Sequence, residues 1–158
     1  MPRAYAHAAT GQAQQDSTEK DAPPVDLKGK RVVVVEDEGI TQMQLRRILT
    51  RAGLVLAGQA FNGQEGITAV LREHPDLVLM DIRMPVLDGL EATRQILEAF
   101  PVCVIMMTGF ADPEYQEEAE RIGASGYMHK PVTASTLIPN MQAAYRRYLS
   151  RQSQGSPE

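Results

Sequence analysis

The sequence predicts an α/β protein whose parallel sheet has helices on both faces. Strand-like and helix-like patterns alternate five times between residues 29 and 150, and this alternation is typical of parallel strands connected by helices. The runs at 32–35, 77–80 and 102–107 are wholly apolar, as expected of strands buried on both faces. Polar residues follow each run, and open α/β sheets bind their ligands at that edge.

Four of the predicted strands end in residues that can carry chemistry. Because the carboxyl ends of parallel strands meet at one edge of a sheet, we expect these side chains to form a cluster. Each residue alone would be an ordinary strand exit, and only their combination is informative. In chain order they are the acidic run Glu36-Asp37-Glu38, then Asp81, Thr108 and Lys130.

The first helix is expected to follow the first strand and to stop at Gly53. Gly53 follows the helical pattern and is a common helix terminator. Leu54 to Phe61 then forms the second strand. Apolar residues of the helix recur at the spacing of one face and should point to the core; they are Leu45, Ile48, Leu49 and Ala52. Met43, Met106 and Met107 are interpreted as core residues.

Capping residues mark the next helices. Asn62 can cap the second helix, with Glu65 completing a box-like arrangement, and His74-Pro75 ends it. Asp112-Pro113 begins the fourth helix, with Asp as the cap and Pro in the first helical position. The expected inward residues are Ile67, Val70 and Leu71 in the second helix, Leu90, Ile96 and Leu97 in the third, near 87–100, and Tyr115, Ala119 and Ile122 in the fourth.

The last helix carries apolar residues at helical spacing and one proline. Pro139 costs a backbone hydrogen bond, so we expect the helix to start late or to kink there. Its inward residues are Leu137, Met141, Ala144, Tyr145 and Tyr148. The polar, Gly- and Pro-bearing segments at either end predict a disordered tail over residues 1–28, a folded domain over 29–150 and a flexible tail over 151–158.

Composition narrows the functional classes. The chain has 158 residues, 43% of them hydrophobic, which fits one globular domain. Its net charge of −4 argues against direct binding of nucleic acid. The single Cys103 lies in an apolar run, so no disulfide framework is expected. The apolar runs are too short to span a membrane, and no secretory signal is recognisable, so we expect a cytoplasmic protein.

The motifs together resemble the receiver domain of two-component response regulators, a family similar to the chemotaxis protein CheY. The matching parts occur in family order across residues 29–150: the acidic pair Glu36-Asp37, the block Asp81…Met84-Pro85…Asp88-Gly89, the pair Thr108-Gly109, and Lys130-Pro131. The resemblance implies a flavodoxin-like (βα)5 doubly wound sheet of five parallel strands in the order 2-1-3-4-5. In this order Asp37 and Asp81 would lie side by side.

The resemblance also implies a chemistry for the cluster. Asp81 would be the phosphoacceptor, forming an aspartyl phosphate. Mg²⁺ would be bound directly by Asp37, Asp81 and the backbone carbonyl of Arg83, and through water by Glu36. Thr108 and Lys130, the latter at an exposed strand end, would contact the phosphoryl group. Asp88 would have a structural role at the start of the third helix.

The implied protein is a signalling switch rather than an enzyme, with weak self-phosphotransfer and autophosphatase activity. On phosphorylation, Thr108 would vacate space that the exposed ring of Tyr127 fills by turning inward. This would change the surface of the fourth helix, last strand and last helix. Arg83 and Phe110 flank the approach of hydrolytic water and predict a slowly decaying phosphorylated form.

The implied partners are a sensor histidine kinase or a histidine phosphotransfer protein, and a downstream protein target. A homodimer through the same surface is left open, as is a role as a phosphorelay shuttle. The segment 130–139 is similar to receivers of ANTAR-type RNA-binding antiterminators, so a truncated regulator of that type is an alternative. A haloacid dehalogenase-type phosphatase would need a second Asp where Arg83 stands, and a flavodoxin would need a phosphate loop where Glu36-Asp37-Glu38 stands.

Overall fold

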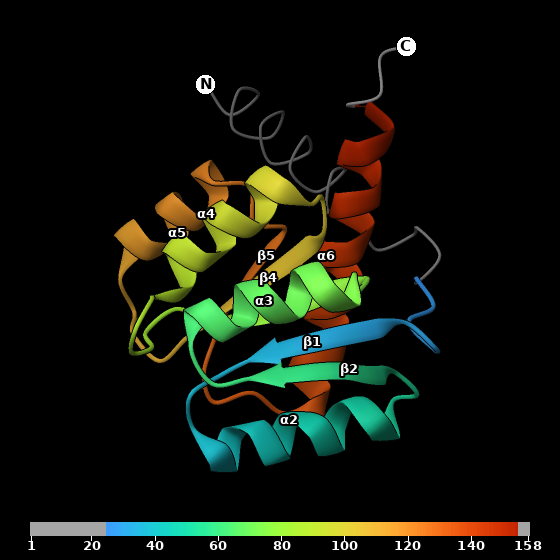
Figure 1. The fold of residues 1–158 in the computed structure, drawn as a ribbon. Helices are drawn as coiled ribbons and strands as arrows, with labels where there is room; N and C mark the ends of the chain where they lie inside the picture. The colour runs from blue at the N-terminus through green and yellow to red at the C-terminus, as the bar shows by residue number, and fades with distance from the viewer. Residues whose placement is uncertain (1–24, 155–158) are drawn as a thin grey trace, which may run out of the picture.

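The computed structural model describes residues 25–154 and contains a five-stranded parallel sheet between two layers of helices (Figure 1). The strand order is β2-β1-β3-β4-β5, and every neighbouring pair is parallel, as predicted. The strands are β1 (Arg31–Val35), β2 (Val55–Ala60), β3 (Leu77–Asp81), β4 (Cys103–Thr108) and β5 (Gly126–His129).

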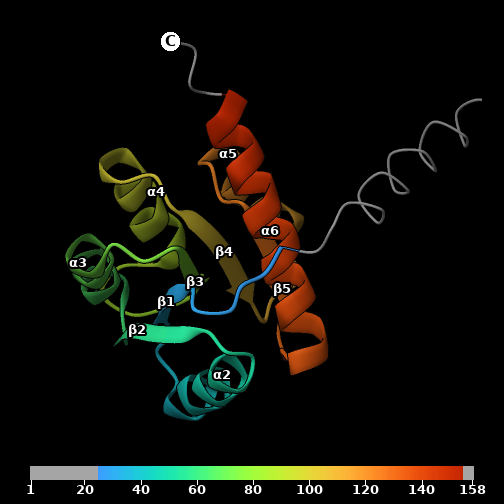
Figure 2. The same cartoon turned by 90° about the vertical axis from the view of Figure 1, so that its right-hand side faces the viewer.

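Five described helices connect and follow the strands. Helices α2 and α6 cover one face of the sheet, and α3, α4 and α5 cover the other (Figure 2). They are α2 (Gly39–Arg51), α3 (Gly63–Glu73), α4 (Gly89–Ala99), α5 (Pro113–Arg121) and α6 (Ala134–Gln154). Pro139 lies inside α6 without ending it.

Strand β1 shows how the sheet divides the core into two parts. Val32 and Val34 pack on the side of α2 and α6, whereas Val33 and Val35 pack on the side of α3, α4 and α5. All four are fully buried, because successive side chains of a strand point to opposite faces. Continuous apolar runs therefore correspond to strands covered by helices on both faces.

The predicted capping residues are confirmed. Asn62 Oδ1 accepts a hydrogen bond from the Glu65 backbone N–H at 2.9 Å, and Glu65 Oε1 accepts one from the Phe61 N–H at 3.0 Å. Asp112 caps α5, with Pro113 in the first turn. Each cap satisfies a backbone donor that the helix itself leaves free, and so fixes where the helix begins after its strand.

Three positions expected in the core are exposed. In α2 the buried stripe consists of Gln42, Leu45 and Leu49, which turns Met43 and Ala52 toward solvent. Met43 is 62% exposed, and Leu71 of α3 is 39% exposed. The apolar pattern did not reveal that the polar residue Gln42 occupies the inner face of α2.

The folded part is longer than the predicted range of 29–150. Leu27 is 4% exposed, and Gln142 of α6 donates a hydrogen bond to the Val25 carbonyl at 3.1 Å. Helix α6 continues to Gln154. The rest of the predicted tails, residues 1–24 and 155–158, lies outside the described residues. Within 25–154 we find no helix with the length and apolar character needed to cross a bilayer.

Candidate functional site

Strand register brings the acidic residues to the centre of the sheet edge. The pairing of β1 with β3 ends at Val35 and Met80, so Glu36 and Asp81 are the next residues on the two strands. Asp81 is also paired with Met107 of β4. Carboxylate oxygens of Glu36, Asp37 and Asp81 all lie within 4.8 Å of one another. The predicted proximity of Asp37 and Asp81 is therefore confirmed, with Glu36 as the residue across from Asp81.

Two of the three carboxylates are buried. Glu36 is 0% exposed and Asp81 is 5% exposed, whereas Asp37 faces solvent. The second oxygen of Glu36 accepts a hydrogen bond from the Glu38 N–H at 3.1 Å. Negative charges this close repel each other and require a cation nearby.

Lys130 supplies part of that positive charge. Its Nζ lies 2.6 Å from Glu36 Oε1 and 3.3 Å from Asp81 Oδ1, and its side chain is only 18% exposed. The expectation of an exposed amine is wrong, because the two buried carboxylates draw the side chain across the strand ends. Burial lowers the pKa of Lys130, but the hydrogen bond and charge of Glu36 and the charge of Asp81 outweigh it, so the pKa is raised overall.

One amine does not neutralise this cluster. Burial, together with the charge of Glu36, raises the pKa of Asp81 from 3.8 to about 7, although Lys130 acts in the opposite direction. Three carboxylates against one ammonium leave an excess of negative charge around hard oxygen donors. This donor set fits a divalent cation such as Mg²⁺, which prefers carboxylate oxygens and retains water molecules.

Thr108 is the last residue of β4, and Lys130 directly follows the neighbouring strand β5. The Lys130 N–H donates to the Thr108 carbonyl at 2.7 Å, which joins the ends of β4 and β5. The Thr108 hydroxyl is buried and accepts a hydrogen bond from the Phe110 N–H at 3.0 Å. In this arrangement the hydroxyl is engaged by the loop that follows its own strand.

The loop after Asp81 approaches the strand closely. A Cβ atom on Gly89 would lie 2.0 Å from the Asp81 carbonyl oxygen, so only glycine fits this position. Asp88 caps α4 by accepting a hydrogen bond from the Glu91 N–H, which confirms its structural role. Val86 has a φ of 70° and is 79% exposed. A β-branched residue is strained in this conformation, and nothing in its sequence pattern indicated it.

Arg83 and Phe110 meet above the site. The guanidinium carbon of Arg83 lies 4.4 Å from the centroid of the Phe110 ring, in a cation–π contact. Arg83 also lines a hollow of about 510 Å³ together with Asp37 and Asp88. Sequence reasoning paired Arg83 with Phe110 by their positions after Asp81 and Thr108, and the structure brings the two side chains into contact.

Gln42 is a site residue that the sequence analysis missed. Its side-chain amide is buried on α2 and donates to the carbonyls of Glu36 at 3.0 Å and Ala60 at 2.8 Å. Its oxygen accepts a hydrogen bond from Gln59. A polar residue on the predicted inner face of a helix was the signal that could have identified it.

Tyr127 differs from the exposed ring that we expected. The residue is half-buried against the core on the α3, α4 and α5 side and makes an edge contact with the ring of His129. Its hydroxyl is buried and has no hydrogen-bond partner among residues 25–154. The ring already lies partly inward while Thr108 is engaged by its own loop.

Comparison with known proteins identifies the family. A model of the response regulator receiver domain matches residues 32–142, which include every residue of the acidic site. The chain belongs to the response regulator receiver domain family. This receiver is 34% identical over 111 residues to the chemotaxis protein CheY of Thermotoga maritima, a match that covers 70% of this chain and 92% of CheY.

Other relatives include longer regulators. The receiver is 34% identical over 119 residues to the transcriptional regulatory protein PdtaR of Mycobacterium tuberculosis, covering 75% of this chain and 58% of PdtaR. The chain thus spans little more than half the length of that relative. Among solved structures, a CheY-like receiver domain protein from Methanospirillum hungatei has a TM-score of 0.72 and 25% identity, covering 78% of this chain and 99% of that protein.

Proposed function

We propose that Asp81 accepts a phosphoryl group and that this receiver acts as a phosphorylation-dependent switch. The observation that carries the proposal is the position of Asp81, which is buried between the acidic pair that follows β1 and the ammonium of Lys130, which follows β5. A carboxylate held between a cation site and an amine can act as a nucleophile toward a phosphoryl group whose charge is neutralised on both sides.

The acidic cluster supports a Mg²⁺ site. Asp37 and Asp81 would bind the ion directly, Glu36 through water, and the Arg83 backbone carbonyl would provide a further oxygen. When bound, the ion neutralises charge on the phosphoryl oxygens and on the acidic cluster.

The residues of the chain then have distinct roles. An Asp81 oxygen forms a bond to phosphorus as the bond from phosphorus to the donor atom breaks, and the donor leaves with the bonding electrons. Lys130 keeps its proton and pairs with the transferred group. The Thr108 hydroxyl leaves its contact with Phe110 and donates a hydrogen bond to a phosphoryl oxygen. This movement frees space toward which Tyr127 shifts further, changing the surface of α5, β5 and α6.

Receiver domains accept phosphoryl groups from histidine kinases or histidine phosphotransfer proteins. For this chain, the surface of α5, β5 and α6 would then control a downstream protein partner or a homodimer. Self-phosphotransfer and slow autophosphatase activity would accompany this signalling role, and a cytoplasmic location agrees with it.

A second role is as the receiver part of a transcriptional regulator, which the similarity to PdtaR supports. A phosphatase of the haloacid dehalogenase type lacks support, because Arg83 occupies the position of its second Asp.

Labelling with a small phosphodonor tests the assignment. Acetyl phosphate with Mg²⁺ should phosphorylate the wild type but not Asp81→Asn. Asp88→Asn is a matched control from the same loop, because asparagine also caps helices and should preserve labelling. Undiminished phosphorylation of Asp81→Asn would refute Asp81 as the phosphoacceptor.

A further inference from the structure

Helix α2 carries three arginines that have no partner in the described part of the chain. Arg46, Arg47 and Arg51 are exposed and make no ion pair or hydrogen bond within residues 25–154, and the helix has no acidic residue. The other arginines in this part of the chain all have a partner. Arg31, Arg72, Arg94 and Arg121 pair with glutamates, Arg147 and Arg151 bond to Ser125, Arg83 contacts Phe110, and Arg146 also interacts.

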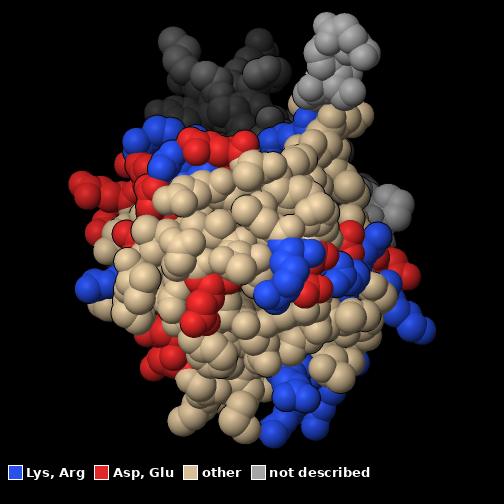
Figure 3. Space-filling model, viewed as in Figure 1, with Lys and Arg blue, Asp and Glu red and all other residues tan. Residues whose placement is uncertain are grey.

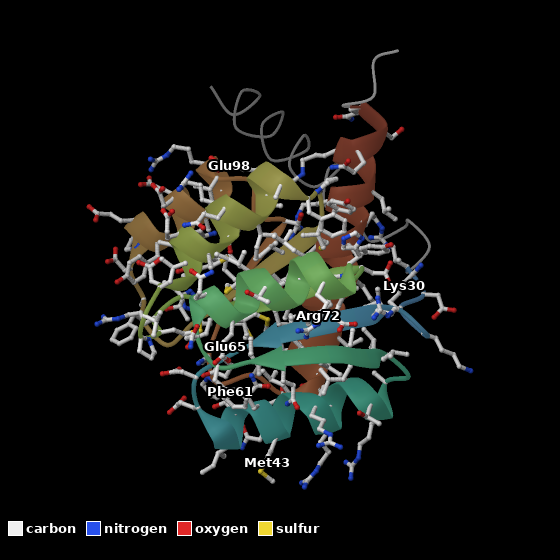
Figure 4. All side chains as sticks on the ribbon, in the orientation of Figure 1. Lys30, Met43, Phe61, Glu65, Arg72 and Glu98 are labelled. Atoms are coloured by element: carbon white, nitrogen blue, oxygen red, sulfur yellow. The ribbon has the colours of Figure 1, made fainter. Side chains whose placement is uncertain are left out.

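The amino-terminal half of the same helix exposes apolar side chains. Ile40 is 74% exposed and Met43 is 62% exposed, and Figure 4 shows Met43 pointing away from the domain. A surface hollow of about 390 Å³ is lined by Met43 and the three arginines together with Thr50. We call the surface of Ile40, Met43, Arg46, Arg47 and Arg51 the basic face. Its apolar and charged parts lie one after the other along α2.

Helix α5 carries the complementary pattern. It contains four glutamates and one arginine, and among the residues that the structure describes only Glu118 of these glutamates forms an ion pair, with Arg121. Glu114 and Glu117 are exposed, and the preceding Phe110 is 50% exposed. We call Phe110, Glu114 and Glu117 the acidic face. Figure 3 shows acidic side chains gathered on the α5 side and basic ones below, over α2.

We propose that the basic face of one molecule binds the acidic face of a second copy of this chain. The two helices present opposite charges, because Arg46, Arg47 and Arg51 are exposed on α2 and Glu114 and Glu117 are exposed on α5. With α2 and α5 side by side in parallel, the arginines of one copy meet the glutamates of the next. Charge complementarity of this kind favours one register of association.

The fold makes this association open-ended. Helices α2 and α5 lie on opposite faces of the sheet, and each follows the carboxyl end of a strand, so both run in the same direction. A shift of the molecule without rotation therefore brings α2 of one copy parallel to α5 of the next. The contact joins two different surfaces, so an array of any length has a free basic face at one end and a free acidic face at the other, and further copies can add there.

Neutral variants can test each face separately. The wild type should show a concentration-dependent increase in mass by sedimentation velocity at about 0.05 M salt, and the increase should be lost at about 0.5 M, because exposed charge pairs are weak and screened. Arg46→Gln/Arg47→Gln and Glu114→Gln/Glu117→Gln should each be monomeric. Their equimolar mixture should form a dimer and nothing larger, because each variant retains one intact face.

The control variant Arg72→Gln/Arg94→Gln removes the same charge from α3 and α4 and should associate like the wild type. All variants should share the wild-type circular dichroism spectrum, and the two face variants, which remove no ion pair, should also keep the wild-type melting temperature. A wild type that stays monomeric at low salt overturns the proposal. The basic face would then bind a different, acidic protein. Failure of the mixture to form a dimer, or loss of association in the control variant, also overturns it.

Discussion

The side-chain amide of Gln42 donates a hydrogen bond to the backbone carbonyl of Glu36, and this contact ties helix α2 to the acidic end of strand β1. The distance between nitrogen and oxygen is 3.0 Å, and both residues are buried. The same amide nitrogen reaches the Ala60 carbonyl at the end of β2. One side chain thus holds the ends of two strands next to the phosphoryl site that we propose.

We predict that Gln42→Ala lowers the free energy of unfolding by about 2–3 kcal/mol, because buried carbonyls lose their donor. Urea denaturation followed by circular dichroism measures this. Gln44→Ala is the matched control, since Gln44 lies on the exposed side of the same helix and its loss should change stability by less than about 0.5 kcal/mol. Equal stability of the two variants would contradict the structural role of Gln42.

The raised pKa of Asp81 predicts how stability depends on pH. The folded protein holds a proton on Asp81 up to a pKa of about 7, whereas the unfolded chain loses it near 3.8. The folded state therefore binds more protons between about pH 4 and pH 7, and the free energy of unfolding falls as pH rises through that window. Above it, the contribution is constant.

Urea titrations in metal-free buffer across this pH range test the dependence. Asp81→Asn cannot lose that proton, so its stability should exceed that of the wild type by a margin that grows toward pH 7 and then levels off. Parallel curves for the two proteins would show that Asp81 is not the group responsible.

Metal binding should depend on Asp37 more than on Glu36. A direct ligand contributes more to affinity than a residue that acts through water. Calorimetric titration with Mg²⁺ should therefore show a greater loss of affinity for Asp37→Asn than for Glu36→Gln. Mg²⁺ should also stabilise the wild type, by about 2.7 kcal/mol at a concentration one hundred times its Kd. An equal loss of affinity in both variants would refute this ranking.

The contact between Arg83 and Phe110 should slow hydrolysis of the aspartyl phosphate. An exposed cation–π contact contributes about 0.5–1 kcal/mol, so Phe110→Leu should shorten the phosphorylated lifetime by about two- to fivefold. Arg83→Asn should shorten it as well, whereas Phe110→Tyr keeps an aromatic ring and should retain the wild-type lifetime. Lifetimes are measured by phosphate release after the donor is removed. If decay is unchanged in Phe110→Leu and Arg83→Asn, another group sets the lifetime.

The sequence was informative where local patterns and topology act together. Apolar runs and the caps Asn62 and Asp112 predicted the alternation of strands and helices, and parallel pairing then required the strand ends to meet. The resemblance to receiver domains supplied the strand order 2-1-3-4-5, and that order predicted that Asp37 and Asp81 lie side by side.

Other features depend on tertiary packing that no local pattern contains. The rotation of α2 decides that Gln42 is buried and Met43 is exposed. The direction of the Lys130 side chain follows from the buried charges of Glu36 and Asp81 on other strands. The conformation of Val86 is imposed by a loop that must return to Gly89, where the chain almost touches the Asp81 backbone.

The reactivity of the buried Cys103 thiol can report how often the centre of the domain unfolds locally. Cys103 is the single cysteine of the chain and lies fully buried in β4, and burial raises its pKa to about 12. Thiol reagents attack the thiolate, so a folded molecule is inert to them, and modification must wait until the sheet separates. The rate of alkylation therefore reports how often the centre of the domain opens, without any added label and in any phosphorylation state.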